Sequence, residues 1–462
     1  MTTNTIRGVP SAAGGLPVIG HSLSVARDPL GLLNSLTTHD GLARVRVGTS
    51  QYVVVCDPGL THHVFVNDRL FDKSECVNSY RTVLGTGLSF CPHTSHRRLR
   101  RLVQPAFHPA RLADYAHVMT RQADALTQDW QPGQDFDVTA EMTRLTTRIM
   151  MEALFSESPS PACLQQIIDD MTTVVRGTYV RTGVPRAVSW LPLPDHHRYQ
   201  RAERRLRQFA SDVLSRRRAE GIGHGDFLSV VPAADAPARP EQGLTDIEIH
   251  DQLLNLLGAG VDNSAANLAW ALHLLAVHPD VEERLHAEVD TVLAGAPATL
   301  EHVPHLVLAG RVITETQRLF PAPWVMLRTV TADTHLGGHP LPAGTHLVIS
   351  PYLIHRREDL YEQPERFDPD RWDPGRSTPP PRNAHIVFGA GPRKCVGDRY
   401  ATVEAIVVLA TITSRWRLRP LTASPPRAAV ASALRPRGLR MGPVPREPRP
   451  QTANDKTPAG AR

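Results

Sequence analysis

Hydrophobic and polar positions follow helical spacing over most of the chain. Between residues 111 and 218 apolar residues recur every three or four positions, apart from a proline-rich break at 184–194, as on helices that bury one face. Residues 42–57 instead alternate around Gly48 and predict a β-hairpin. The pattern therefore predicts a mainly α-helical protein with small β-sheets.

The longest helical signal runs from Thr245 to His278. Thr245 and Glu248 have the spacing of a capping box, and Pro279 ends the helix. At a rise of about 1.5 Å per residue this helix spans on the order of 50 Å. Because it is apolar on most sides, we expect it to be buried at the centre of the fold.

The remaining elements follow in the second half of the chain. Helical spacing predicts helices at 279–293 and 306–320, and extended segments lie at 325–331 and 347–352. Residues 359–384 are irregular and rich in proline. Irregular stretches of this length inside a compact domain usually serve function.

Composition narrows the classes of protein. With 462 residues, several domains share the chain or one large core encloses something extra, such as a cofactor. The net charge is +5 and the arginines are spread along the chain, which argues against a nucleic-acid partner. The five cysteines form no CxxC pair or disulfide framework, and no apolar run reaches about 20 residues. We therefore expect a cytoplasmic protein without a membrane span.

The main candidate for a functional site is the segment around Cys395, just before a helix expected at 398–416. A cysteine at a helix start faces free amides and the positive end of the helix dipole, which favours the iron-binding thiolate by lowering the pKa of the thiol. Gly389, Gly391 and Gly397 let the backbone approach a flat ligand. Arg393 could pair with a carboxylate of that ligand. The ordinary alternative is a buried cysteine in a glycine-rich turn.

The spacing of this segment resembles the haem-binding loop of the cytochrome P450 family, FxxGxRxCxG. Ala401 and Glu404 also occupy the usual downstream positions of that motif. The resemblance implies the P450 fold, a triangular prism with a long central helix over the haem, and haem b with Cys395 as the axial ligand of its iron. The residues that match the loop are Phe388, Gly391, Arg393, Cys395 and Gly397.

Two further motifs support the resemblance. Glu315 and Arg318 lie three apart, which on its own would indicate an ordinary surface pair. The family's ExxR and PERF motifs instead imply a network of Glu315, Arg318 and Arg366 that locks the cysteine loop. His96 and Arg100 match the family's HxxxR pair.

By resemblance, His96 and Arg100 hold haem propionates, with Arg328 as a third contact. A solvated basic helix face is the alternative for the first two. The resemblance extends from about Gly15 to Met441. It implies one haem domain at 15–442, a flexible segment at 1–14 and a disordered tail at 443–462.

The predicted long helix carries a match to the family's oxygen-binding signature at 259–263. Gly260 and Asp262 fit the signature, and Asp262 would relay protons for the activation of O2. Asn263 stands where the family usually has threonine, and an amide cannot pass a proton as a hydroxyl does. Ser264 is about 100° further round and could replace that hydroxyl only where the helix is locally distorted. Asn263 with ordered water, Ser264, or a substrate hydroxyl remain as proton routes, unless Asn263 simply packs.

The resemblance also indicates a substrate pocket. Its expected lining is apolar and suits a hydrocarbon-like ligand; it comprises Leu256, Ala259, Trp324, Val325, Met326 and Ala433. The alternative for Trp324, Val325 and Met326 is that they belong to the core. Stretches such as 248–252 and 350–352 resemble actinobacterial terpene-oxidising members of the albaflavenone and pentalenene type. This implies hydroxylation of a cyclic sesquiterpene or diterpene in secondary metabolism. The alternatives are a polyketide, macrolide or steroid substrate, carbon–carbon coupling, or a ligand sensor that does not oxidise.

Electrons must come from elsewhere, because only 67 residues follow Cys395 and no flavin or iron–sulfur domain fits there. We expect NAD(P)H to supply them through separate redox partners and the protein to be a monomer. Basic residues near Cys395 could form a proximal face for an acidic ferredoxin, or merely be solvated. They are Arg382, Arg393, Lys394 and Arg399.

Overall fold

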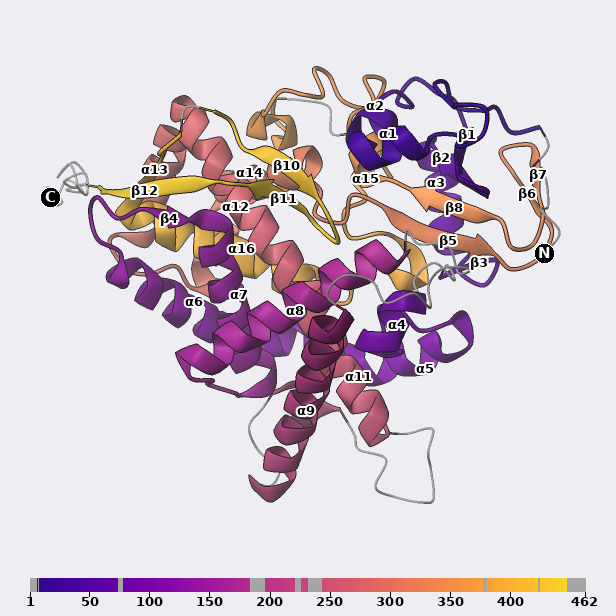
Figure 1. Cartoon of the computed structure of the whole chain (residues 1–462). Coiled ribbons are helices and arrows are strands. Elements are labelled where there is room, and N and C mark those ends of the chain that lie inside the picture. Colours follow the sequence, from indigo (N-terminus) through magenta and orange to yellow (C-terminus); the bar gives the residue numbers. More distant parts are fainter. Residues whose placement is uncertain are drawn as a thin grey trace, which may run out of the picture.

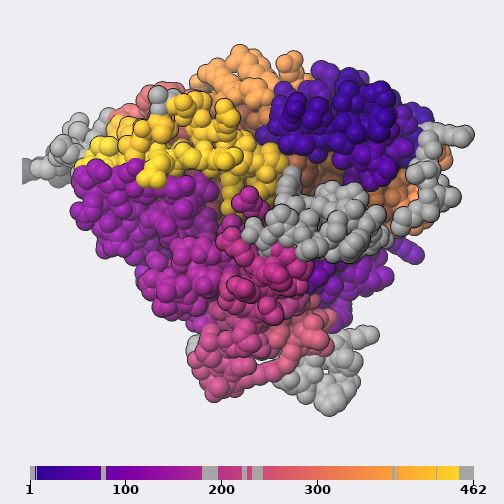
Figure 2. All heavy atoms as spheres, viewed as in Figure 1, coloured from indigo at the N-terminus to yellow at the C-terminus, as the bar shows by residue number. Residues whose placement is uncertain are grey.

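Helices make up most of the computed structural model (Figure 1), which confirms the predicted fold class. The structure describes residues 6, 8–73, 78–182, 196–220, 226–231, 243–376, 380–381, 383–422 and 424–446. In Figure 2 the outline tapers from a broad upper face toward the end of helix α9. No helix within these ranges is long and apolar enough to cross a membrane.

In Figure 1 the helices nearest the N-terminus (indigo) lie at the upper right beside a sheet, and the later helices of the first half form the lower and left parts. The helices of the first half are α1 (Ser22–Arg27), α2 (Pro29–Asn34), α3 (Pro58–Val66), α4 (Asn78–Leu84), α5 (His93–Val103), α6 (Leu112–Asp129), α7 (Val138–Phe155), α8 (Pro161–Thr182), α9 (His196–Glu220) and α10 (Phe227–Val230). The predicted break at 184–194 lies outside the described residues.

The central helix has the predicted position but is not uniform. It consists of α11 (Asp246–Leu256), a π-helical segment (Leu257–Val261) and α12 (Asp262–Val277). The capping box of Thr245 and Glu248 begins α11, as predicted. Residues 264–275 of α12 are all buried, and α12 packs against α7, α14 and α16.

Three later helices agree with the predicted ranges: α13 (Pro279–Leu293), α14 (Val307–Leu319) and α16 (Asp398–Arg415). A fourth, α15 (Pro351–Ile354), was not predicted. The extended segment expected at 347–352 ends earlier than predicted, because Pro351 starts the short helix α15, which Ser350 caps.

A five-stranded sheet lies to one side of the helices (Figure 1), in the order β1-β2-β8-β5-β3. Its strands are β1 (Leu42–Val47), β2 (Ser50–Val55), β3 (Phe71–Lys73), β5 (Met326–Val330) and β8 (His346–Ile349). The predicted hairpin is confirmed as the antiparallel pair β1 and β2.

The smaller sheets involve the C-terminal part of the chain. One has the order β4-β12-β9, and two hairpins, β6–β7 and β10–β11, stand apart from it. The strands are β4 (Phe136–Asp137), β6 (Thr334–Leu336), β7 (His339–Leu341), β9 (Trp416–Pro420), β10 (Arg427–Val430), β11 (Leu434–Arg437) and β12 (Arg440–Pro445).

At both ends, residues beyond the predicted domain limits contact the fold. Val9 and Ala12 are buried, and the Ala12 N–H donates to the carbonyl of Arg44. At the other end, residues 443–445 belong to β12, and Arg446 pairs with Asp290 at 2.8 Å. Residues 1–5, 7 and 447–462 lie outside the described residues.

Candidate active site

One cavity of about 1270 Å³ brings most of the predicted site residues together. The cysteine loop lines it from one side and the π segment with the start of α12 from another. The predicted residues that line it are His96, Arg100, Leu256, Ala259, Gly260, Asp262, Asn263, Ser264, Trp324, Val325, Met326, Arg328, Phe388, Arg393, Cys395 and Gly397.

Two residues predicted for the haem loop and the substrate pocket do not line the cavity. Ala433 does not line the cavity; it is fully buried against Ala266 and Ala322, because the hairpin tip turns it into the core. Gly391 supports the cysteine loop from behind: its φ is +67°, and a Cβ there would lie 2.4 Å from the carbonyl oxygen of Phe65. Only glycine therefore lets the loop approach α3 this closely.

The cysteine loop folds back on itself and presents the Cys395 thiol to the cavity. The Cys395 N–H donates to the carbonyl of Phe388 at 2.9 Å, and the Arg100 guanidinium donates to the carbonyl of Lys394. Burial raises the pKa of the Cys395 thiol, although the Gly397 N–H and Arg100 act in the opposite direction. The amide at the helix start thus acts on the pKa of this thiol in the predicted direction, but desolvation has the larger effect.

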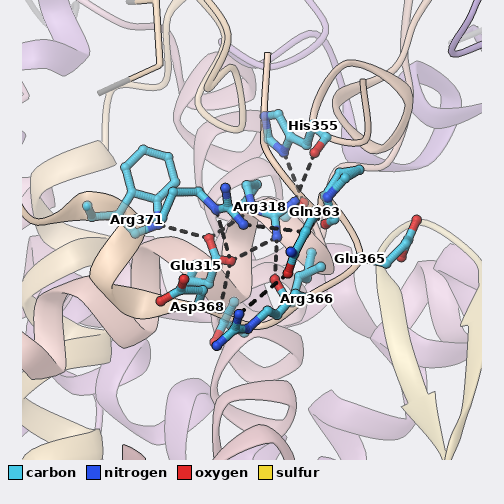
Figure 3. A network of polar contacts seen from close by, with 12 residues as sticks. Glu315, Arg318, His355, Gln363, Glu365, Arg366, Asp368 and Arg371 are labelled. Atoms are coloured by element: carbon cyan, nitrogen blue, oxygen red, sulfur yellow. Dashed lines mark hydrogen bonds and ion pairs between the residues drawn. The ribbon is translucent and has the colours of Figure 1, made fainter. Parts of the chain in front are cut away.

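A buried ion pair on α14 holds the irregular segment that precedes the cysteine loop in the chain (Figure 3). Glu315 and Arg318 are fully buried and bidentate, with both nitrogen–oxygen distances at 2.8 Å. Arg318 also donates to the carbonyls of His355, Pro364 and Arg366. One guanidinium thus holds two loop segments against α14, as bidentate charged contacts do most strongly.

The predicted third member of this network needs a correction. Arg366 contributes only its carbonyl, because a turn closed by its N–H to Gln363 directs its side chain outward, toward Gln363 Oε1 at 3.4 Å. The second guanidinium near Glu315 belongs to Arg371, at 3.5 Å. The indole of Trp372 donates to Glu315 at 2.9 Å as well.

A cluster of cations lines the other end of the cavity. Lys73 faces Arg328 directly across the β3–β5 pair, an arrangement that is unfavourable for like charges. Burial, with Arg393 nearby, lowers the pKa of Arg328 to about 10 and that of Lys73 well below its usual value. Arg328 Nε is buried and has no hydrogen-bond partner in the described part of the chain. The cluster therefore fits a group that carries carboxylates, such as haem.

His96 and Arg393 complete the surroundings of this cluster. Burial, with Arg393 nearby, lowers the pKa of His96 to about 4, so the imidazole is neutral at pH 7. Arg393 was expected to pair with a ligand carboxylate, but its guanidinium pairs with Asp68 at 3.2 Å and Asp72 at 2.6 Å. It braces the cysteine loop, and Lys73, which no sequence motif indicated, adds a cation.

The polar residues at the start of α12 are all engaged. The Asn263 amide donates to the carbonyl of Ala259 at 2.6 Å. Asp262 accepts from Ser432 Oγ at 3.0 Å and forms an ion pair with Arg435. Both partners of Asp262 belong to the β10–β11 hairpin and its turn, so this carboxylate ties the hairpin to α12.

Ser264 contacts Glu404, which in the sequence stands out only as a downstream position of the cysteine-loop motif. Its hydroxyl donates to Glu404 Oε2 on α16 at 2.5 Å. Glu404 is 1% exposed, and its Oε1 has no partner among the described residues. Burial raises the pKa of Glu404 to about 7, against the effect of the Ser264 hydrogen bond. The π segment before Asp262 is the local distortion that the Ser264 hypothesis required.

Comparisons with known proteins agree with this geometry. A family model described as Cytochrome P450 matches residues 10–440. Cyclooctat-9-en-7-ol 5-monooxygenase of Streptomyces melanosporofaciens is 40% identical over 412 residues, 89% of this chain and 90% of that protein. Cyclooctatin synthase of the same organism is 41% identical over 440 residues, 94% and 95% of the two chains.

Two more similarities are informative. Pentalenene oxygenase of Streptomyces avermitilis is 37% identical over 435 residues, 93% of this chain and 96% of the relative. The crystal structure of the cytochrome P450DA heme domain matches with a TM-score of 0.85 at 24% identity, covering 95% of this chain and 98% of that one. The structural match shows a common fold.

Proposed function

The chain belongs to the cytochrome P450 family, and from that premise we propose that it hydroxylates a cyclic terpene regioselectively. Its cofactor is thiolate-ligated haem b. When bound, the haem supplies the activation of O2 and the insertion of one oxygen atom into the substrate. The proposal depends on one observation above all: Cys395 faces the same cavity as the glycine-containing π segment.

The chain's own residues would hold this cofactor from three sides. Cys395 supplies the thiolate, and the cations Lys73 and Arg328 meet the carboxylates. The Glu315–Arg318 pair holds the irregular segment 364–368, which precedes the cysteine loop in the chain. If carbon monoxide binding to the reduced holoprotein lacks a thiolate-type spectrum that Cys395→Ser abolishes, this assignment fails.

For proton delivery the geometry favours Ser264 over Asn263. The amide of Asn263 is bonded to the helix backbone, and Asp262 is held by Arg435. Ser264 combines a hydroxyl at the cavity with a buried carboxyl behind it, Glu404, whose proton occupancy is intermediate near pH 7. We infer that this pair holds the proton closest to the reaction. Ser264→Ala should then divert reducing equivalents from product to peroxide, whereas Asn263→Ala should do so less.

The distal part of the cavity suits a terpenoid. Its aliphatic and aromatic lining includes Leu84, Leu88, Leu256, Val325 and Met326, which matches a bulky hydrocarbon skeleton. The relatives named for cyclooctat-9-en-7-ol and pentalenene point to the same class. Among cyclic terpenes and terpene alcohols, at least one should displace water from ferric iron and give a product heavier by one oxygen. A spectral shift without turnover would identify a ligand sensor instead.

The expected proximal face requires a correction. Lys394 pairs with Asp398 at 2.5 Å, Arg393 is buried in its ion pairs, and Arg382 lies outside the described residues. Arg399 is the expected residue that stays exposed. Two of the four predicted charges, those of Arg393 and Lys394, are therefore neutralised within the chain.

A basic groove beside the cysteine loop is the better candidate for ferredoxin docking. Arg100 joins the two, because it lines the groove and donates to the carbonyl of Lys394. An acidic ferredoxin would meet a positive surface there, and association should slow as salt rises. The basic lining residues are Arg97, Arg100, Arg101, His108 and Arg111.

A further inference from the structure

A cluster of exposed aliphatic side chains lies near the N-terminal end of the domain. Of the ten large hydrophobic residues exposed in the described ranges, four fall within residues 16–23: Leu16 (44%), Val18 (82%), Ile19 (43%) and Leu23 (41%). Isolated exposed aliphatics are ordinary, whereas a contiguous group often marks an interaction surface. We refer to residues 16–23 as the apolar knob.

Hydrogen bonds fix the conformation of the apolar knob. Backbone hydrogen bonds join Leu16 and Gly20 in both directions, at 2.9 and 3.0 Å. The Arg46 guanidinium donates to the carbonyl of Leu16 at 2.7 Å and also to that of Pro17. Gly20 has φ +60°, and a Cβ there would lie 2.4 Å from the Arg46 carbonyl oxygen. The fold thus fixes a turn whose side chains reach solvent.

This knob adjoins the outer end of the active-site cavity. Helix α1, which begins directly after the turn, carries Leu23, and its residues 25–27 line the cavity. Leu23 and Arg27 lie four residues apart and so share one side of the helix. In Figure 2 this N-terminal segment (indigo) and the C-terminal strands (yellow) occupy the same face.

Three exposed arginines line the outer part of the cavity on these two segments: Arg27, Arg427 and Arg437. Arg427 and Arg437 stand directly opposite each other across β10 and β11. Like charges in that position destabilise a hairpin unless an anion lies near. None of the three forms an ion pair within the described chain, and the neighbouring Asp28 accepts from the Gly31 N–H as the cap of α2.

We propose that this face docks on an anionic lipid bilayer. The apolar knob enters the headgroup region, and the three arginines meet lipid phosphates, the combination that holds peripheral proteins at membranes. The cavity then opens toward the phase into which an apolar substrate partitions. The docking itself does not depend on the identity of that substrate, so it can fail while the proposed activity stands.

The test is sedimentation of the haem-loaded protein with lipid vesicles at low salt. Binding is expected to vesicles of phosphatidylglycerol and phosphatidylcholine in equal parts and to be much weaker with phosphatidylcholine alone. Exchanging Val18 and Ile19 for serine together should weaken binding by about tenfold or more. Arg427→Gln and Arg437→Gln should each weaken it by about fivefold and lower its salt dependence.

Matched variants separate docking from general surface effects. Ile247 is 73% exposed on α11, and Ile247→Ser should bind as the wild type does. Arg69→Gln, an exposed arginine at the far edge of the five-stranded sheet, should also be neutral. An unchanged carbon monoxide spectrum verifies that each variant is folded.

The proposal is overturned if the anionic vesicles bind no better than neutral ones, or if Ile247→Ser weakens binding as much as the knob variants do. It is also overturned if the protein forms dimers that Val18→Ser dissolves and binds no vesicles. In that case the apolar knob is an interface between two copies of the chain.

Discussion

Replacing Glu404 by glutamine tests the most unusual titratable group of the site. Glutamine keeps the shape of the side chain and an oxygen that can accept from Ser264, but it cannot ionise. In the wild type, the carboxyl is buried beside that single donor, and its pKa rises from 4.5 to about 7. The variant therefore removes one charge from the interior and leaves the packing in place.

The expected effect on stability follows from this shift. An acid whose pKa is higher in the folded state than in the unfolded state does not lower the free energy of unfolding at a pH below the unfolded pKa. Its cost grows between pH 4.5 and 7 and stays constant above that. With about 1.4 kcal/mol for each pKa unit, the buried carboxylate costs about 3 kcal/mol at pH 8. Glu404→Gln should recover most of this free energy at pH 8 and little of it at pH 5.

The assay is the difference in urea unfolding midpoint between variant and wild-type holoprotein at pH 5 and pH 8. Ser264→Ala is the matched control: it removes the hydrogen bond that favours the ionised form, so it should lower stability more at pH 8 than at pH 5. Equal effects of Glu404→Gln at the two pH values would refute the reasoning, since they would mean that the carboxyl does not titrate in this range.

Three other predictions concern the fold and the partner. Arg318→Met should lower the free energy of unfolding by about 3–5 kcal/mol, because it leaves Glu315 charged and buried; Arg371→Met, which leaves the bidentate pair intact, should cost much less in the same denaturant titration. Burial and nearby arginines lower the pKa of His286 to about 3. Because the unfolded chain binds a proton below pH 6.5 that the folded chain does not, the free energy of unfolding should fall by about 2 kcal/mol between pH 7 and pH 5. His286→Leu should flatten that fall in unfolding curves across this range. Arg101→Gln should slow reduction by an acidic ferredoxin severalfold at low salt and hardly at high salt in stopped-flow measurements.

The sequence predicted the features that a local pattern determines. Cys395 and its glycines form one continuous segment, and Glu315 and Arg318 share one helix face, so the resemblance to the family's motifs could indicate that they act together. The long central helix followed from its cap and its apolar faces, and its predicted limits agree with α11 through α12. In each case the residues that matter lie within a few turns of one another.

Local sequence patterns could not predict the contacts that depend on how distant segments of the chain pair with each other. Lys73 reaches the cation cluster because β3 pairs with β5 and places it opposite Arg328. Arg371 replaces the Arg366 side chain beside Glu315 because a turn at Gln363 reverses which groups face inward. Likewise, the pKa of Cys395 depends on how deeply the loop is buried, which the position of a helix start does not reveal.

Two acids near the start of α12, Asp262 on that helix and Glu404 on α16, divide two tasks that the sequence analysis gave to Asp262 alone. Asp262 is bonded to Arg435 and to Ser432, and Ser432 also lines the cavity. A substrate that displaced the hairpin tip would also displace the partners of this carboxylate, so we expect the surroundings of Asp262 to depend on whether the cavity is filled. Glu404 instead lies behind Ser264 on α16, within the protein core and away from that hairpin. Under the proposed role of Ser264, the proton of Glu404 would be supplied at the same place whatever substrate the hairpin contacts, and a chain without the usual threonine would still have a hydroxyl for proton delivery.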